Sequence, residues 1–252
     1  MTERAVFDAA VWCVLVLSPV TWIALTKITA PYGRHVRAGW GPQVSSKLGW
    51  VLMEAPSAIG FAAIFLLGED FAQPAALLLA ALWLLHYGHR AFVFPFRRRA
   101  SNRPMPMVIV GMGATFNCVN IYINARWLSH FGSYTTAWIG DWRLWIGSVL
   151  FLVGFAINLR SDQVLINLRR TGDSGYSVPT GGLYRFVSCP NYLGEVVEWS
   201  GWALAAWSLP GLAFALYTAS NLVPRAVAHH RWYRSNFADY PAERRAIVPL
   251  LY

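Results

Sequence analysis

Seven apolar segments of this 252-residue chain are each about long enough to cross a lipid bilayer. They lie near 6–28, 47–68, 73–96, 105–127, 143–160, 190–208 and 210–233. A spanning helix needs roughly 20 predominantly apolar residues. Because hydrophobic residues make up 56% of the chain and charged residues only 13%, an ordinary soluble domain is excluded. Backbone groups in lipid must satisfy their own hydrogen bonds, so the expected fold class is all-α, a polytopic membrane protein with seven transmembrane helices.

The basic residues predict how these helices are oriented. If the N-terminus lies outside, the inner side receives all 21 lysines and arginines except Arg4, Arg126 and Arg143. Such an excess of positive charge in inner loops is typical of membrane proteins, so we expect the N-terminus outside and the C-terminus in the cytoplasm. The net charge of +9 is then explained by contact with the membrane, and no nucleic-acid partner is predicted. This orientation suits a bacterial inner membrane, or the endoplasmic reticulum if the source is eukaryotic.

The chain is expected to form one domain. No internal repeat or low-complexity linker divides residues 1–252. Only Ser-Leu-Pro-Gly at 208–211 separates the last two apolar segments, which predicts a tight turn between antiparallel helices. The first apolar segment has no small-residue cleavage site after it and should remain as a helix. We expect a monomer surrounded by membrane lipids.

Metal ligands are sparse in this sequence. The three cysteines lie far apart and form no CxxC pair, so neither a disulfide framework nor a zinc site is indicated. His86 and His89 share one helical face, and His229 and His230 are adjacent, which raises the alternative of a di-iron site. Such a site needs many more ligands than two pairs, and the chain has only six histidines, so no metal is predicted.

Several polar side chains lie in or beside the apolar segments near their inner ends. Asn158 and Asp162 stand four residues apart, and Asn191, Glu195 and Glu198 follow steps of four and three, so each set shares a helix face. An ionisable group at the centre of a spanning helix costs about 2.5 to 3.5 kcal/mol, so such groups are expected to face a site inside the bundle. The cations expected near them are Arg169, Arg170, Arg185 and Arg225. Guanidinium groups suit a phosphorylated ligand, although arginines at helix ends also snorkel or form ion pairs between helices.

Glu54 and Tyr87 are a carboxyl and a phenol, each within an apolar run. A phenol is a hydrogen-bond donor at neutral pH, and desolvation drives a carboxyl towards its neutral, donating form. Two such donors could hold a carbonyl oxygen on which negative charge develops. The alternative is structural, with Glu54 paired to Arg90 or a histidine and Tyr87 in the aromatic belt at the membrane surface.

Motifs spread along the whole chain point to a known family. They are PYGRH at 31–35, MEAPS at 53–57, HYGHRAFVFPF at 86–96, NRPMP at 102–106, INLRSD at 157–162, GYSVPTGGLYRFVSCPNYLGE at 175–195 and AHHRWY at 228–233. On these motifs the sequence closely resembles the steroid 5α-reductase family, also called 3-oxo-5α-steroid 4-dehydrogenases. The wider superfamily also contains reductases of enoyl lipids and polyprenols, which leaves another conjugated lipid as an alternative substrate.

The resemblance implies a seven-helix enzyme that uses NADPH to reduce the C4–C5 double bond of a 3-oxo-Δ4-steroid to the 5α product. It implies that Glu54 and Tyr87 are catalytic and hold the C3 carbonyl. The cofactor-binding residues that it implies are Tyr32, Arg103, Asn158, Asp162, Arg169, Tyr176, Asn191, Glu195, His229 and Tyr233. The steroid is expected mainly among helices one to four, with Trp50, Trp83, Phe116 and Phe214 as further wall residues, and NADPH mainly among helices five to seven and the cytoplasmic loops.

The chain departs from the family pattern at three positions. Met53 stands where many animal members have Gln, Met112 replaces an expected basic residue, and Ser177 replaces an Arg that often follows the loop tyrosine. Fewer cations for the 2′-phosphate shift more of its recognition to Arg103, Arg169 or Arg170, or weaken the preference for NADPH.

Two other functional classes remain open from the residues alone. A membrane methyltransferase that uses S-adenosylmethionine would share the outline formed by Tyr184, Arg185, Val187, Pro190, Tyr192 and Gly194. Those enzymes usually have His-Pro where this chain has Cys189 and Pro190, and they do not require MEAPS or HYGHR. A lipid-binding or transport bundle would explain the helices but gives the buried polar set no task.

Overall fold

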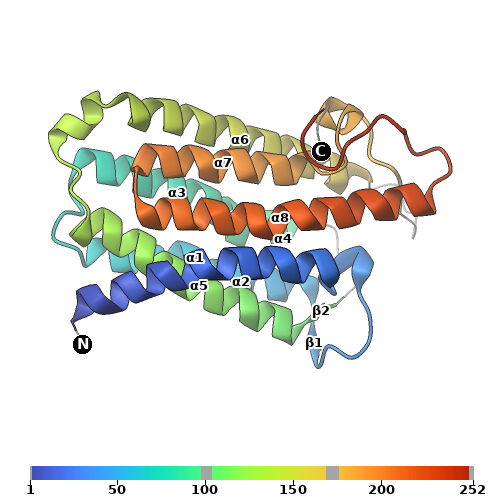
Figure 1. The fold of residues 1–252 in the computed structure, drawn as a ribbon, viewed down its shortest axis with the longest axis horizontal. Helices are drawn as coiled ribbons and strands as arrows, with labels where there is room; N and C mark the ends of the chain where they lie inside the picture. Colours follow the sequence, from blue (N-terminus) through green and yellow to red (C-terminus); the bar gives the residue numbers. More distant parts are fainter. Residues whose placement is uncertain (1, 98–103, 169–175, 250–252) are drawn as a thin grey trace.

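Seven long helices run along the described part of the molecule (Figure 1). The structure is a computed structural model, and it describes residues 2–97, 104–168 and 176–249. The long helices are α1 (Glu3–Lys27), α2 (Ser46–Leu66), α3 (Pro74–Phe92), α5 (Met107–Arg126), α6 (Trp142–Leu168), α7 (Pro190–Ala206) and α8 (Leu209–Asn236). The all-α fold class predicted from the sequence is confirmed.

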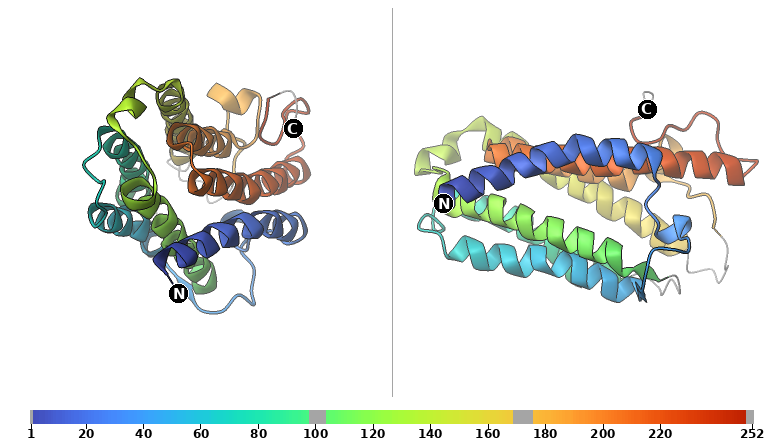
Figure 2. Two further views of the ribbon diagram at one scale, coloured as in Figure 1. Left: turned by 60° about the vertical axis from the view of Figure 1, so that its left-hand side comes forward. Right: turned by 60° about the horizontal axis from the view of Figure 1, so that its bottom comes forward.

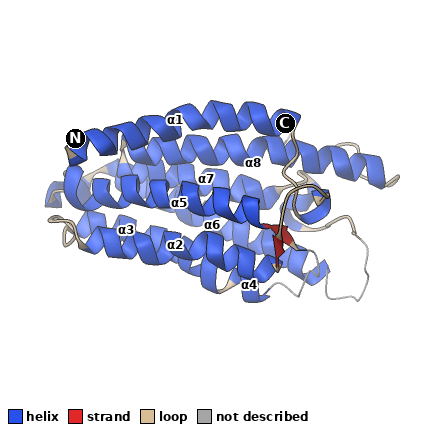
Figure 3. Cartoon of the chain, turned by 90° about the horizontal axis from the view of Figure 1, so that it is seen from below, coloured by secondary structure: helices blue, strands red, loops and turns tan. Residues whose placement is uncertain are grey.

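The two strands of the described residues lie at one end of the bundle (Figure 3). Strand β1 (Gln43–Val44) pairs antiparallel with β2 (Met105–Pro106), and the single turn α4 (Phe94–Arg97) follows α3. At this end α1, α3, α6 and α8 finish, while α2, α5 and α7 begin. We call it the site end, because the polar residues of the bundle gather there.

Five helical stretches within the described ranges are long and apolar enough to cross a membrane. They are Glu3–Lys27, Ser46–Leu66, Pro74–Arg97, Met107–Phe131 and Trp142–Leu168. The two remaining expected spans exist as helices, but α7 has only 17 residues and α8 carries five cationic or histidine side chains in its second half, Arg225, His229, His230, Arg231 and Arg234. The structure is therefore that of a helical membrane protein, while seven spans and the orientation of the termini stay predictions.

Neighbouring helices close a ring around the interior (Figure 2). Its order is α6, α7, α8, α1, α5, α2 and α3, and α3 packs back against α6 and α7. The ring order differs from the chain order because α5 lies between α1 and α2. This arrangement lets every long helix contribute side chains to one central space.

Glycines bring α6 and α7 into direct backbone contact. Gly147 and Gly154 of α6 face Gly201 and Gly194 of α7, so that each pair packs without side chains between the helices. A Cβ added at Gly201 would lie 2.5 Å from the Phe151 nitrogen, and one at Gly194 would lie 2.6 Å from the Asn158 nitrogen. Small residues at such crossings allow the close approach typical of membrane helix pairs. The close approach places polar residues of the two helices beside one another.

An aromatic core fills the bundle beside the site. Trp83 is fully buried, and its ring lies 4.6 Å from Phe61 and 5.3 Å from each of Trp199, Trp202 and Phe214, measured between centroids. Its indole nitrogen donates to the Ser57 carbonyl at 2.9 Å. Trp83 is not among the residues that line the central cavity, so its expected role as a wall residue is wrong.

Two expected helix boundaries are also corrected. The fifth apolar segment was predicted to end at 160, but α6 continues to Leu168 because Asn158 and Asp162 point into the bundle and find polar partners there. The sequence predicts Pro210 and Gly211 in the turn between the last two helices, but both residues lie in the first turn of α8. The chain reverses at Trp207, which has a left-handed φ of 44°, and at Ser208, whose hydroxyl accepts from the Gly211 nitrogen at 3.1 Å. Proline is tolerated there because the first-turn nitrogens need no partner within the helix.

Candidate active site

A cavity of about 1110 Å³ lies inside the ring towards the site end, and all seven long helices contribute to its wall. Small-molecule sites commonly occupy about 300 to 1,000 Å³, so this space exceeds that of one ligand of ordinary size. The predicted site residues that line it are Tyr32, Trp50, Glu54, Tyr87, Phe116, Asp162, Tyr176, Asn191, Glu195, Phe214 and His229. The structure thus gathers residues that lie up to about two hundred positions apart in the sequence.

Two predicted residues within the described ranges are not in the wall. Asn158 lies behind it and binds two wall residues, and Tyr233 accepts a hydrogen bond from Arg34 at 3.0 Å. Arg103 and Arg169 lie outside the described residues.

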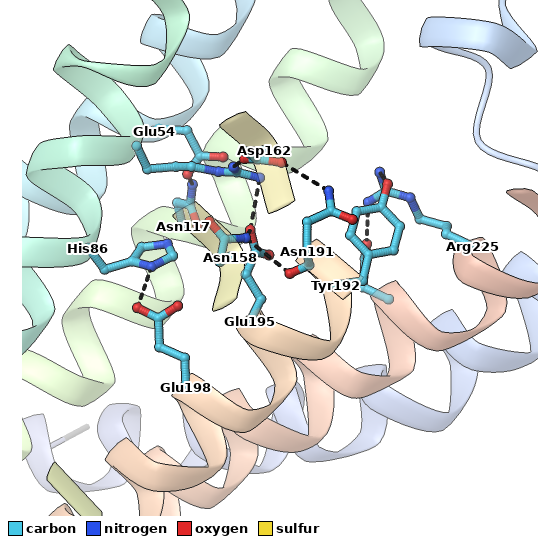
Figure 4. Close-up of polar contacts among 12 residues, drawn as sticks. Glu54, His86, Asn117, Asn158, Asp162, Asn191, Tyr192, Glu195, Glu198 and Arg225 are labelled. Atoms are coloured by element: carbon cyan, nitrogen blue, oxygen red, sulfur yellow. Dashed lines mark hydrogen bonds and ion pairs between the residues drawn. The ribbon is translucent and has the colours of Figure 1, made fainter. Parts of the chain in front are cut away.

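A buried ion-pair network forms the polar part of the wall (Figure 4). Arg90 of α3 donates to Asp162 of α6 at 3.1 Å and to Glu195 of α7 at 2.9 Å. The Asn158 amide donates to Glu195 at 3.2 Å and to the Asn191 carbonyl at 3.0 Å, while the Asn191 amide donates to Asp162 at 3.1 Å. Charges out of water are tolerated when paired and hydrogen-bonded in this way. The network holds α3, α6 and α7 in one register.

Arg90 is the main charged residue of the cavity wall that was not expected there from the sequence. It was expected only as a structural partner of Glu54, but it pairs with Asp162 and Glu195 instead. Its guanidinium also lies over the Trp50 ring, 4.8 Å from the centroid. The signal available was its position one turn after Tyr87 in HYGHR, since a cation in an apolar run is itself an indication of a site.

Glu54 is held at the cavity by its neighbours on α2 and α5. The Asn117 amide lies 3.5 Å from a Glu54 carboxylate oxygen and donates to the Met53 carbonyl at 2.7 Å. Pro56 lies inside α2 and cannot donate to the preceding turn, which frees a carbonyl and weakens the local helix ladder. The buried Asn117 amide stabilises this weakened turn, and so fixes the part of α2 that presents Glu54.

Tyr87 faces the same cavity from α3. Only 4% of it is exposed, and its ring packs against Trp83 at 5.1 Å and Trp199 at 5.6 Å. Such packing on both sides limits the rotamers of the phenol. Glu54 and Tyr87 therefore face the same cavity from two different helices. The cavity wall is otherwise largely apolar.

Beside Tyr87, His86 and Glu198 form a second buried pair. Their side chains are 6% and 0% exposed, and His86 Nδ1 lies 2.7 Å from a Glu198 oxygen. His86 lines the cavity, whereas Glu198 lies behind it. The spacing along α7 puts Glu198 on one face with Asn191 and Glu195. Glu198 nevertheless pairs with His86 of α3 and not with their network, because α3 crosses α7 at that point.

A chain of hydrogen bonds crosses the rim of the cavity at the site end. Arg225 donates to the Tyr192 hydroxyl at 2.9 Å, which lies 3.2 Å from His229 Nε2. His229 Nδ1 in turn lies 3.1 Å from His35 Nε2 in the loop after α1. The Arg225 guanidinium also lies over the Tyr32 ring, 4.9 Å from its centroid. This rim joins α7, α8 and the loop 28–45.

Partial burial and three nearby arginines lower the pKa of His35 to about 4. The imidazole is therefore neutral at physiological pH, with one nitrogen able to donate and the other able to accept. A neutral His35 fits the hydrogen bond to His229, which would be lost if both rings carried two N–H groups.

Arg34 sits in an aromatic cage next to this rim. Its guanidinium lies 5.3 Å from the Tyr176 centroid, 4.8 Å from Trp232 and 4.3 Å from Tyr233. Its Nη1 is buried and has no hydrogen-bond partner among the described residues. An unsatisfied buried donor of a guanidinium is a position at which an anionic oxygen would be stabilised.

The donors at this end fit a phosphorylated nucleotide. Arg34 and Arg225 supply cations, Tyr32 and Tyr176 supply aromatic faces, and Asn191 and Glu195 supply a polar edge deeper in the cavity. Among the residues that the structure describes, no group of three or more His, Cys, Asp and Glu side chains is placed to hold a metal ion. The arrangement is suited to an organic, anionic ligand that extends from the rim towards Glu54 and Tyr87.

Comparison with known proteins gives a consistent result. The profile of the 3-oxo-5-alpha-steroid 4-dehydrogenase family matches residues 103–252. The Arabidopsis thaliana protein steroid 5-alpha-reductase DET2 is 42% identical over 251 residues, covering 96% of each chain. The 3-oxo-5-alpha-steroid 4-dehydrogenase 1 of Bos taurus is 39% identical over 258 residues, covering 100% of this chain and 99% of the bovine protein. The human protein of that name is 41% identical over 229 residues, covering 88% of this chain and 86% of its own.

These matches run the length of the chain and include every helix that lines the cavity. With the motifs and the geometry, they show that the chain belongs to the 3-oxo-5-alpha-steroid 4-dehydrogenase family of oxidoreductases.

Proposed function

We propose that this protein reduces the C4–C5 double bond of 3-oxo-Δ4-steroids to the 5α-dihydro product with NADPH. The observation that carries the proposal is a single cavity that joins an apolar region next to Glu54 and Tyr87 with a cationic, aromatic rim. Membership of the family supports the reaction class. An integral membrane location supports a lipid-soluble substrate, and seven spans with the N-terminus outside complete the proposed topology.

The steroid would lie among apolar side chains with its C3 carbonyl at the polar pair. Trp50, Phe116 and Phe214 line the cavity and offer flat faces to a rigid ring system. Tyr87 and Glu54 would donate to the carbonyl oxygen from α3 and α2. This arrangement places two polar groups of the cavity wall, from two different helices, at the carbonyl oxygen.

The role of the two donors follows from where charge develops. Reduction at C5 turns the enone into an enolate, so negative charge grows on the C3 oxygen in the transition state. Donors fixed at that oxygen therefore lower the barrier more than they tighten binding of the substrate. When bound, NADPH supplies the hydride. Burial of Tyr87 among aromatic rings keeps its phenol aimed at the oxygen and excludes water.

The nucleotide would extend from the rim inward. Arg34, Arg225 and His229 suit phosphate groups, and Tyr32 and Tyr176 suit the planar or sugar parts of the molecule. The polar network around Asn191 and Glu195 would bind the end closest to Tyr87. Arg103 and Arg169 are proposed as further phosphate ligands on the strength of their motifs.

A direct assay tests this proposal. Detergent-purified protein is incubated with NADPH and testosterone or progesterone, and the product is identified by mass spectrometry. A 5α-dihydro product is the expected result. Binding of NADPH with turnover of an enoyl lipid or polyprenol in place of the steroid would assign the site to another conjugated lipid. Failure to bind NADPH, with binding of S-adenosylmethionine, would overturn the reductase proposal.

A further inference from the structure

We propose that His86, coupled to Glu198, is the acid that delivers a proton to C4 of the substrate. This inference rests on the proposed reduction, which adds a hydride at C5 and leaves C4 to be protonated. Tyr87 and Glu54 are assigned to the carbonyl oxygen, so neither accounts for the new C–H bond. The proton must come either from water or from an acid close to that oxygen, and His86 and Glu198 offer such an acid.

The pair is built to hold a proton away from water. His86 Nδ1 lies 2.7 Å from Glu198, and the two side chains are 6% and 0% exposed. The second oxygen of Glu198 is buried and has no hydrogen-bond partner among the described residues. A carboxylate in that position is poorly compensated, so the pair is stabilised when it carries a proton.

The position of His86 matches that of the reacting carbon. It precedes Tyr87 on α3, the two rings lie 4.9 Å apart between centroids, and both residues line the cavity. C4 is bonded directly to C3, whose oxygen would sit at Tyr87. With Nδ1 turned to Glu198, Nε2 is the nitrogen of His86 that remains for the substrate. The acid and the carbon that it protonates are thus on the same side of the cavity.

The other acidic groups of this wall are engaged elsewhere. Asp162 and Glu195 both pair with Arg90, which stabilises their charged forms. His89, one turn further along α3, does not line the cavity and packs against Phe155 and Phe94. Within the described part of the cavity wall, His86 is therefore the titratable side chain best placed for the transfer.

The proton transfer balances within the pair. At rest Glu198 carries a proton that it donates to His86 Nδ1, and Nε2 carries the other. The Nε2–H bond breaks as the enolate electron pair forms the C4–H bond, and the Glu198 proton moves to Nδ1. The pair ends as a neutral imidazole beside a carboxylate. Water that reaches the cavity after product release restores the proton.

The test compares His86→Asn with His89→Asn. The Asn side-chain oxygen approximates the position of Nδ1 and still accepts a hydrogen bond from protonated Glu198, but Asn has no group at the position of Nε2. General acids typically contribute about 10²- to 10⁴-fold, and we expect kcat of the His86 variant to fall by that factor with KM for NADPH within about threefold. The His89 variant should behave as the wild type.

Protonation in D₂O gives the second readout. A fixed acid delivers deuterium to one face of C4, so the wild-type product should be a single C4 diastereomer by NMR. The His86→Asn product should be a mixture, because water protonates the enol without a fixed direction. A slow variant that still yields one diastereomer would mean that His86 only positions Tyr87, and wild-type kcat in the variant would equally overturn the proposal.

The Glu198→Gln variant tests the contribution of Glu198 separately from that of His86. Gln keeps a hydrogen bond to His86 but holds no transferable proton, so kcat should fall as in His86→Asn, whereas wild-type kcat would overturn the shared-proton step. NADPH protection of each variant against thermal unfolding checks that it is folded. If the wild type itself reduces no steroid, the proposed function fails; if the wild type is active and these variants match it, only this inference fails.

Discussion

Arg90 sets the electrostatics of the polar wall. It forms ion pairs with both Asp162 and Glu195, and its position over Trp50 joins these ion pairs to the apolar part of the cavity. One cation between two carboxylates leaves the Asn158 and Asn191 amides to satisfy the remaining oxygens. Glu54 forms neither of these ion pairs, and its hydrogen-bond partner among the described residues is the Asn117 amide.

Replacing either carbonyl donor should lower turnover without removing the cofactor site. We expect Tyr87→Phe and Glu54→Gln each to lose about 100- to 1000-fold in kcat, since one donor at a developing oxyanion is typically worth about 2.7 to 4 kcal/mol. NADPH binding, followed by fluorescence, should change little. Tyr122→Phe is the matched control, because that tyrosine on α5 lies outside the cavity wall. Normal turnover in both site variants would remove the proposed carbonyl clamp.

Asp162 gives a prediction about the cofactor. Asp162→Ala removes one partner of Arg90 and the acceptor of the Asn191 amide, so the polar edge of the cavity should lose its geometry. A hydrogen bond to a charged group is worth about 1.5 to 3 kcal/mol, which corresponds to roughly a 10- to 100-fold rise in KM for NADPH. Steady-state kinetics at saturating steroid measure this KM for NADPH. Arg169→Ala is expected to act in the same direction, and an unchanged KM in both variants would place the nucleotide elsewhere.

The lowered pKa of His35 should make the stability of the folded chain depend on pH. Its pKa is about 4 in the folded chain against an ordinary value of 6.5, so the unfolded chain binds more protons between those values. The free energy of unfolding should therefore fall as the pH is lowered from about 6.5 to about 4. His35→Gln removes this titration, and thermal unfolding of the variant in detergent should lose less on acidification than the wild type does. Parallel pH curves for the two proteins would contradict the assignment.

At the scale of elements, the α6–α7 contact fixes the site. Gly147, Gly154, Gly194 and Gly201 allow the two backbones to touch, and this contact sets the Asn158 amide against Glu195. The sequence predicted the polar faces of both helices from their spacing. It did not predict the glycine pairs, because the value of a glycine at a helix crossing depends on which helix lies opposite.

A methyl group at this crossing should separate the helices. Gly201→Ala would place Cβ 2.5 Å from the Phe151 nitrogen, and overpacking typically costs about 1 to 3 kcal/mol. We expect a lower melting temperature in detergent and a higher KM for NADPH, because Asn158 moves with α6. Gly88→Ala on α3 is the control, since nothing lies within 4 Å of its added Cβ. Equal melting temperatures for the two variants would show that α6 can shift freely.

Most helix ends could be predicted from sequence patterns alone. Six of the seven expected segments begin and end within a few residues of the observed helices, because a run of apolar residues in lipid has little choice but a helix. The fifth ends eight residues later than expected, since its inner end is polar but buried. Whether a polar helical turn is buried depends on the partners that other helices supply.

The whole molecule is a ring with one polar end, and the basic loops give it a predicted orientation. Thr2 caps the beginning of α1 and Ser235 lies in the last turn of α8, so the two residues are near opposite ends of the bundle, and both are exposed. In a variant whose three native cysteines are replaced, we expect Thr2→Cys to react with a membrane-impermeant maleimide in intact bacterial cells. Ser235→Cys should react only after permeabilisation. The reverse pattern would invert the topology and place the rim of the cavity outside.

The sequence by itself determined the helical membrane fold, the family and the polar residues that gather at one end, since each depends on composition, local spacing or motifs. Only the tertiary structure decided that Arg90 pairs with Asp162 and Glu195, that Trp83 belongs to the core and that His86 meets Glu198. These outcomes depend on the ring order, in which α3 closes against α6 and α7. Pairing across a bundle is set by which faces meet, and no pattern within one helix carries that information.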